Sequence, residues 1–215
     1  MMSTETVAMN MGAPVVIAKA LEDACIKFGI ETQNQKSHFL GQIYVESGGF
    51  KRLRESLNYS VDGLLRTFGR HRISAKDAMR HGRAAGQHPA NQEALANILY
   101  GGDWGAKNLG NTNPGDGWAF IGRGLKQLTG RSNYAMYSQA MYGDDRIVRN
   151  SILLEGLPDA ALSAGWYWSS RNLNALAEAN AYDKVTRKIN GGLNGYEDRV
   201  AATKKAAAFF ESLKD

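Results

Sequence analysis

The chain has 215 residues, of which 43% are hydrophobic and 22% are charged, and its formal net charge is +5. These values are normal for a globular domain that buries a sizeable core. The moderate cationic excess favours an anionic partner such as nucleic acid, an anionic membrane or bacterial cell wall. The single cysteine, Cys25, excludes an intramolecular disulfide and a cysteine-based zinc site.

The N-terminal residues are expected to form a flexible leader over 1–13, followed by a single catalytic domain over 14–215. The leader has no basic start and no apolar segment long enough for a signal peptide, and no run approaches a transmembrane span. We therefore expect a cytoplasmic protein without stable membrane insertion. A target outside the cytoplasm would require a separate route of release.

Apolar residues at helical spacing predict helices through most of the chain. The first stripe, from Ile17 to Phe28, ends at Gly29, and a second helix ends at "ESGG" (residues 46–49). Further helices are expected at "SAKDAM" (74–79), capped by the Ser at its start, and at "PANQEALANILY" (89–100) and "PDAALSAGWYW" (158–168), where proline suits the first turn. A terminal amphipathic helix is expected over 195–213, and an inserted helical lobe over 62–100. Alternating patterns typical of strands are scarce, so the chain is expected to be mainly α.

The segment 101–131 is unusually rich in glycine and contains Trp104 and Trp118. A long glycine-rich segment inside a compact domain is usually functional or disordered. The aromatic and amide side chains between the glycines favour a binding surface.

Glu46 follows the apolar stripe of Phe39 and Ile43, so its carboxyl is expected to point toward the core. It also ends the helix, where the negative pole of the dipole disfavours a second negative charge. Both effects favour the protonated form that a general acid needs. The alternative is a glutamate that only decorates a helix end before Gly48 and Gly49.

Glu55 has the opposite surroundings, because the nearby cations Lys51, Arg52 and Arg54 favour the ionised carboxylate. Two carboxyls whose surroundings favour opposite forms are the pattern of an acid/base pair. An inverting glycosidase needs about 6.5–9.5 Å between its carboxyls to admit water. The alternative for Glu55 is a surface ion pair of little energetic value.

Four blocks occur in order along the chain: "ESGGF", "ESLNYS", "GDGWAFIGRGLKQLTGRSNY" and "KINGGLNGYEDR". Together they resemble the family 19 glycoside hydrolases, and among these the lysozyme-like endolysins of bacteriophages. The resemblance implies a mainly α, lysozyme-like domain with a central cleft and a small inserted helical lobe. It also implies inverting hydrolysis of β-1,4 bonds in polymers that contain N-acetylglucosamine.

The resemblance also implies roles for individual residues. Glu46 matches the general acid, and Glu55 matches the general base that activates water. Thr129 matches the Ser/Thr that helps to hold this water, since a hydroxyl both accepts and donates hydrogen bonds. The implied substrate-contacting residues are Gln127, Asn133, Tyr134, Asn190 and Arg199, with Tyr100, Trp118 and Arg123 as further cleft candidates.

Several of these residues have structural alternatives. Trp118 is nearly as often a local core residue, Asn190 could form a helix C-cap and turn, and Arg199 could pair with a neighbouring acid on its own helix. Two positions depart from the family pattern. Val45 stands where the family commonly has His, and Lys126 occupies a usually apolar position, from which its charge is expected to face solvent.

Peptidoglycan and chitin share the β-1,4-linked aminosugar backbone, so the acid/base pair does not discriminate between them. The short single domain, the cationic balance and the similarity to phage enzymes favour peptidoglycan. We therefore expect a monomeric phage-type endolysin that cleaves between MurNAc and GlcNAc. It would accumulate in the host cytoplasm until a holin let it reach the wall in the periplasm. The alternatives are a bacterial chitinase of the same family and a non-catalytic wall-binding module.

Other classes of function are disfavoured by the sequence. The basic residues are scattered and no nucleic-acid-binding motif is present, so no nucleic-acid partner is expected. The four histidines lack an i, i+4 pair and the HExxH spacing, so no metal site is expected. The predicted reaction requires no cofactor.

Overall fold

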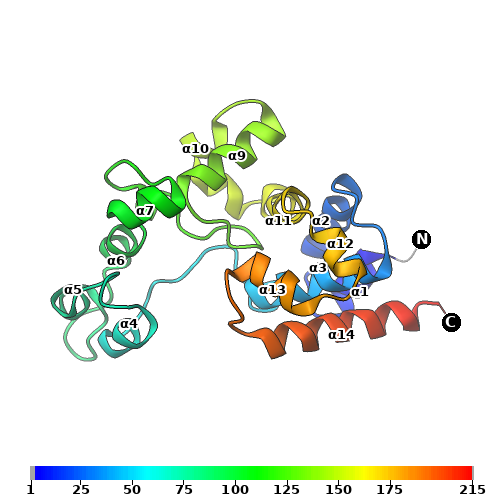
Figure 1. Cartoon of the computed structure of the whole chain (residues 1–215), viewed down its shortest axis with the longest axis horizontal. Helices are drawn as coiled ribbons and strands as arrows, with labels where there is room; N and C mark the ends of the chain where they lie inside the picture. Colours follow the sequence, from blue (N-terminus) through cyan, green and yellow to red (C-terminus); the bar gives the residue numbers. More distant parts are fainter. Residues whose placement is uncertain (1–2, 215) are drawn as a thin grey trace. The chain divides into compact units, whose positions relative to one another are not determined.

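The computed structural model describes residues 3–214, and within this range helices joined by loops form the fold (Figure 1). Extended backbone occurs there only as isolated bridges, such as Arg54 with Arg123. The mainly α prediction is therefore confirmed. The helices are α1 (Thr4–Asn10), α2 (Val15–Lys27), α3 (Gln33–Glu46), α4 (Val61–Thr67), α5 (Ala75–His81), α6 (Gln92–Leu99), α7 (Gly102–Leu109), α8 (Asp116–Ala119), α9 (Arg131–Tyr142), α10 (Arg146–Arg149), the 3-10 helix η1 (Ser151–Glu155), α11 (Asp159–Ser170), α12 (Leu173–Glu178), α13 (Tyr182–Asn190) and α14 (Tyr196–Ser212).

The chain divides into two compact units. The first unit comprises the residues up to Leu53, the short segment Gly124–Gln127 and the residues from Ile152 onward. The second unit comprises Arg54–Arg123 and Leu128–Ser151. The inserted lobe expected over 62–100 thus lies inside a larger second unit, which also contains α7 to α10.

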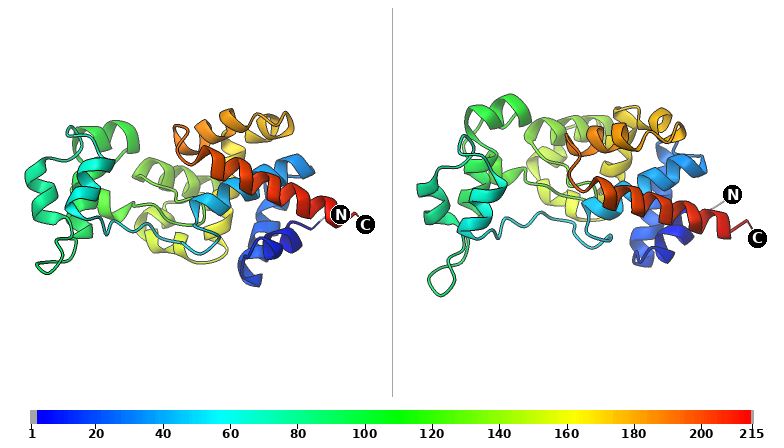
Figure 2. Two further views of the ribbon diagram at one scale, coloured as in Figure 1. Left: turned by 90° about the horizontal axis from the view of Figure 1, so that it is seen from below. Right: turned by 60° about the horizontal axis from the view of Figure 1, so that its bottom comes forward.

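The first unit is built around α3, which lies along α14 in both views of Figure 2. Their contact depends on Gly41, because a Cβ there would lie 2.6 Å from the backbone nitrogen of Thr203. A capping box between Thr32 and Gln35 begins α3. Gly48 and Gly49, with φ of 59° and 78°, end it, as the "ESGG" pattern predicts. This ending places Glu46 in the last turn.

The N-terminal part of the chain differs from the expected flexible leader. Residues Thr4–Asn10 form helix α1, whose N-cap Ser3 accepts a hydrogen bond from the backbone of Thr6. Val7 and Ala8 are fully buried in the core of the first unit. The expectation is wrong for this segment because its few apolar residues gain packing partners from α2 and α14.

The second unit has its own apolar core, made by Leu57, Leu64, Leu95, Leu99 and Ile121 with their neighbours. The predicted cap at Ser74 is confirmed, since its hydroxyl accepts from the backbone nitrogen of Asp77. The prediction of Pro89 in the first turn of α6 is wrong. The Asn91 side chain caps this helix instead, accepting from Ala94.

Between residues 3 and 214, no helix is both long enough and apolar enough to cross a bilayer.

Candidate active site

Glu46 lies in the last turn of α3 and is bound by two cations of the first unit. The Arg199 guanidinium on α14 donates to Oε1 of Glu46 at 2.6 Å. The Lys126 ammonium lies 3.4 Å from Oε2. Since the Glu46 side chain is only 12% exposed, both contacts are largely shielded from solvent.

Arg199 is held in place by contacts beyond Glu46. It donates to Oε1 of Gln42 at 2.7 Å and to the backbone carbonyl of Asn194 at 3.2 Å. Gln42 in turn donates to the hydroxyl of Thr186 on α13 at 3.3 Å. Arg199 therefore joins α3 to α14 through a connected polar network, and its predicted alternative of pairing with a neighbouring acid on α14 does not occur.

Lys126 contradicts the expectation that its charge faces solvent. The residue is 6% exposed, and its ammonium lies 4.5 Å from the centre of the Tyr167 ring on α11. Lys126 and Arg199 also replace the apolar surroundings expected for Glu46. The surroundings of Glu46 are therefore more cationic than its apolar helical stripe predicts.

Glu55 belongs to the second unit, and neutral donors bind both of its carboxylate oxygens. The Tyr100 hydroxyl donates to Oε1, and the backbone nitrogen of Gly122 donates to Oε2 at 3.1 Å. The backbone nitrogen of Glu55 donates to the Gly122 carbonyl at 2.8 Å. The nearby cation Arg54 lies over the Trp118 ring, 4.7 Å from its centre. A fixed carboxylate that keeps free lone pairs can accept a proton from water.

Tyr100 remains a donor to Glu55 across the neutral pH range. Burial, followed by the adjacent Glu55 carboxylate, raises the pKa of its hydroxyl above the ordinary value of 10. Its backbone carbonyl accepts from the Asn111 side chain at 2.8 Å, which ties the end of α6 to the glycine-rich segment. The expected cleft residue Tyr100 is thus placed directly on the proposed base.

Two predicted substrate contacts in the first unit have different surroundings. The Asn190 amide nitrogen is buried and has no hydrogen-bond partner among the described residues. An unsatisfied buried donor is costly, and it is a group that a ligand could satisfy. Gln127 has φ of 58° and donates to the Gly124 carbonyl at 2.9 Å, so its side chain supports the local turn.

Among the predicted residues of the second unit, Tyr134 and Arg123 are buried. Tyr134 is fully buried and donates to the Ile121 carbonyl at 2.6 Å. Arg123 is 4% exposed and donates to the Ala119 carbonyl at 2.7 Å. Both side chains hold the loop that presents Gly122, and their role in the cleft stays a prediction.

The other residues of this group are partly exposed. Asn133 donates to the Thr129 carbonyl at 2.8 Å and so fixes the end of the loop. Trp118 is partly buried against the core of the second unit and carries Arg54 on its ring. Its core alternative is therefore partly correct. The role of Thr129 in holding water stays a prediction.

Gln42 and Lys126 belong to the surroundings of Glu46, although neither was predicted as a site residue from the sequence. Gln42 precedes Glu46 by one helical turn, so its place on the same face of α3 is visible in the sequence. The charge of Lys126 at a usually apolar position was the available signal for that residue. In the part of the chain that the structure describes, no group of His, Cys, Asp and Glu side chains could hold a metal ion.

Comparisons with known proteins bear on the fold and on the family of the chain. No family profile matches the chain. Chitinase C from Streptomyces griseus has the same fold, with a TM-score of 0.65 and 20% identity, covering 98% of this chain and 93% of its own. A bacterial family 19 chitinase gives a TM-score of 0.59 and 15% identity, with coverages of 98% and 95%.

The sequence similarity is greater for a protein of Haemophilus influenzae. That protein is described as a glycosyl hydrolase family 19 domain-containing protein and is 37% identical over 185 residues, which cover 85% of this chain and 84% of its own length. Identity of this extent, over nearly the whole of both chains, shows a common family. The chain therefore belongs to glycoside hydrolase family 19 and is a glycoside hydrolase with a chitinase-like fold.

Proposed function

We propose that this glycoside hydrolase is a phage-type endolysin that cleaves the MurNAc–GlcNAc bond of bacterial peptidoglycan with inversion. The observation that supports an active enzyme is the contact set of each carboxylate. Glu46 is bound by Arg199 and Lys126, and Glu55 by Tyr100 and Gly122. A binding module has no need of two carboxyls held in this way.

In the proposed reaction Glu46 protonates the glycosidic oxygen as the bond from C1 to that oxygen breaks. Arg199 holds Oε1 at 2.6 Å, whereas Lys126 approaches Oε2 only to 3.4 Å. We therefore assign the transferred proton to Oε2, because Lys126 lies farther from this oxygen than Arg199 lies from Oε1. Arg199 keeps the carboxyl in a fixed orientation throughout, which is the form of preorganisation that proton transfer requires.

Glu55 completes the proposed reaction by removing a proton from the attacking water. Its two donors orient the carboxylate and leave lone pairs for that proton. The oxygen of the water then bonds to C1 from the face opposite the leaving group, which gives inversion. In the family pattern the hydroxyl of Thr129 helps to hold this water.

The choice of peptidoglycan over chitin rests on charge. The chain has a net charge of +5, and peptidoglycan carries peptide carboxylates whereas chitin is uncharged. A chitinase is the second candidate, favoured by the fold shared with chitinase C. For the endolysin, we propose accumulation of the monomeric protein in the host cytoplasm, release by a holin, and action on the wall from the periplasm.

The experiment that tests the proposal is a digest of purified Gram-negative peptidoglycan, reduced with borohydride and analysed by mass spectrometry. Reduced MurNAc ends from the wild type, absent with Glu46→Gln, are the expected result. Glu197→Gln is the matched control, because Glu197 is exposed on α14. If the wall stayed intact while chitin oligomers were cleaved, the chitinase would replace the endolysin as the proposed function. Cleavage of neither polymer would favour the binding module.

A further inference from the structure

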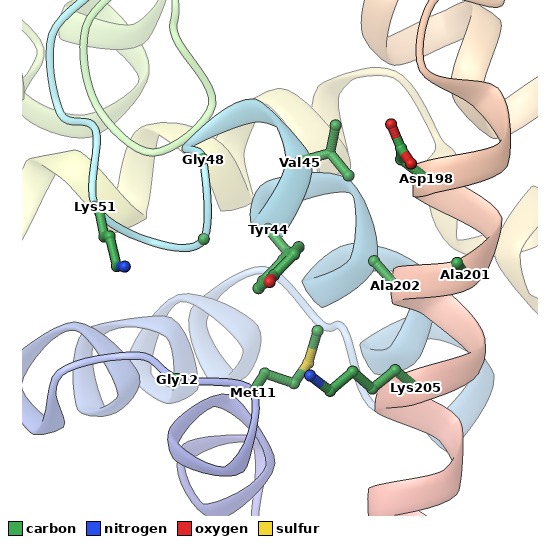
Figure 3. Close-up of a pocket in the computed structure, with 11 residues that line it drawn as sticks. Met11, Gly12, Tyr44, Val45, Gly48, Lys51, Asp198, Ala201, Ala202 and Lys205 are labelled. Atoms are coloured by element: carbon green, nitrogen blue, oxygen red, sulfur yellow. The ribbon is translucent and has the colours of Figure 1, made fainter.

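An open groove of about 540 Å³ lies in the first unit beside the last turn of α3 (Figure 3). Val45, which lines it, directly precedes Glu46 at the end of α3, and the lining residue Gly48 follows Glu46 by two positions. The volume is that of a site for a small ligand rather than a single ion. None of the residues that line it was predicted to contact substrate from the sequence.

The groove is lined by both apolar and charged side chains. On α14 the lining residues Asp198, Ala201, Ala202 and Lys205 recur at helical spacing and so share one face. The lining also includes Val45 and Met11, and the Tyr44 ring lies between the side chains of Lys51 and Lys205 in Figure 3. The ligand is therefore expected to be extended, partly apolar and charged.

The charged groups of the groove have no ion-pair partner among the described residues, and the Lys205 ammonium lies 6.0 Å from the centre of the Phe209 ring. Within residues 3–214, neither Lys51 nor Lys205 forms a salt bridge, and Asp198 forms none either. Asp198 and Lys205 are two turns apart on α14, about 10 Å along the axis. Three extended residues of a peptide span about the same length.

We infer that this groove binds the stem peptide that peptidoglycan carries on its muramic acid. The inference rests on the proposed function, since chitin has no such peptide. The stem peptide of Gram-negative walls offers alanine methyl groups, at least two free carboxylates and the ammonium of a diamino acid. Lys51 and Lys205 would take the carboxylates, Asp198 the ammonium, and the alanines of α14 the apolar part.

Binding of the stem peptide in this groove would affect which glycan strands the enzyme cleaves. A peptide attached to the sugar at the bond being cleaved extends only a few residues from that bond. Binding it beside α3 would help to place the muramic acid at Glu46. Glycan strands that lack their peptides should then be poorer substrates than native strands.

The test compares two substrates and two double variants. Native glycan strands and strands freed of peptide by an amidase contain the same glycosidic bond. Lys51→Gln combined with Lys205→Gln should lower kcat/KM about 10-fold on native strands and leave it unchanged on peptide-free strands. Lys27→Gln combined with Lys204→Gln removes the same charge from exposed positions outside the groove and should change neither.

A binding measurement separates this inference from the proposed function. Calorimetry with soluble muramyl tripeptide should detect binding to the wild type and to the control, and a several-fold loss for the Lys51, Lys205 double variant. The inference would be overturned if the ratio of kcat/KM on native strands to kcat/KM on peptide-free strands were the same for the wild type and both double variants. It would also be overturned if the wild type cleaved the wall but did not bind the tripeptide. Failure to cleave either strand would instead count against the proposed muramidase activity.

Discussion

At the scale of single residues, the proposed base depends on one hydroxyl. Tyr100 donates to Oε1 of Glu55, and its raised pKa keeps the proton on the hydroxyl. Tyr100→Phe should therefore lower kcat about 10-fold with little change in KM, because a hydrogen bond to a charged group that orients the base is lost. Steady-state kinetics on soluble glycan measure this. An unchanged kcat would show that the Gly122 backbone alone orients Glu55.

The two cations at Glu46 are expected to differ in importance. Arg199 binds at 2.6 Å and also holds Gln42, whereas Lys126 is 3.4 Å away at a usually apolar position. Arg199→Met should abolish measurable activity and cost about 3 kcal/mol of stability, because Glu46 loses the partner that fixes it. Lys126→Met conserves volume and should retain activity within about threefold. Chemical denaturation and steady-state kinetics of both variants measure these effects. A larger loss of activity for Lys126→Met than for Arg199→Met would contradict the prediction.

At the scale of elements, the packing of α3 on α14 depends on a missing side chain. Because a Cβ at Gly41 would lie 2.6 Å from the backbone of Thr203, Gly41→Ala should force the helices apart and destabilise the protein by about 2 kcal/mol. Gly192→Ala is the matched control, since nothing lies within 4 Å of the Cβ that it would add. The thermal unfolding midpoints of the two variants measure the difference. Equal midpoints would show that the two helices can move apart at no cost.

The same helix contains a histidine that should make stability depend on pH. His38 is 1% exposed, and burial lowers the pKa of its ring below the ordinary value of 6.5 despite a hydrogen bond to Asn180. The unfolded chain therefore binds the proton more readily, so His38 stabilises the fold above pH 6.5 and destabilises it on acidification. Denaturation at pH 7.5 and pH 5 should show a smaller acid loss for His38→Gln than for the wild type. Equal losses would show that His38 does not contribute.

At the scale of the whole molecule, short sequence patterns correctly predicted the helical class and several helix ends. The glycines after Glu46 and the cap at Ser74 marked helix ends correctly, because caps and turns are satisfied within a few residues. The apolar spacing likewise predicted the helical class. The four blocks that resemble family 19 predicted the family that the Haemophilus influenzae protein shows.

Contacts between distant segments could not be predicted in this way. Arg199 reaches Glu46 across 153 positions, and Lys126 reaches it across 80. Spacing and composition carry no information on such pairs. The prediction of apolar surroundings for Glu46 therefore missed both cations. Helix α1 was missed for the same reason, since its burial comes from other helices.

The most direct test of the proposed mechanism is the configuration of the product at the moment of cleavage. Proton NMR of freshly hydrolysed, soluble GlcNAc–MurNAc oligosaccharides distinguishes the α from the β form of the new reducing end before they interconvert. If Glu46 acts as acid and Glu55 activates water, the first signal will be the α-anomer and will be absent with Glu55→Gln, but present with the exposed control Glu93→Gln. A first signal from the β-anomer would contradict the inverting mechanism and the role assigned to Glu55.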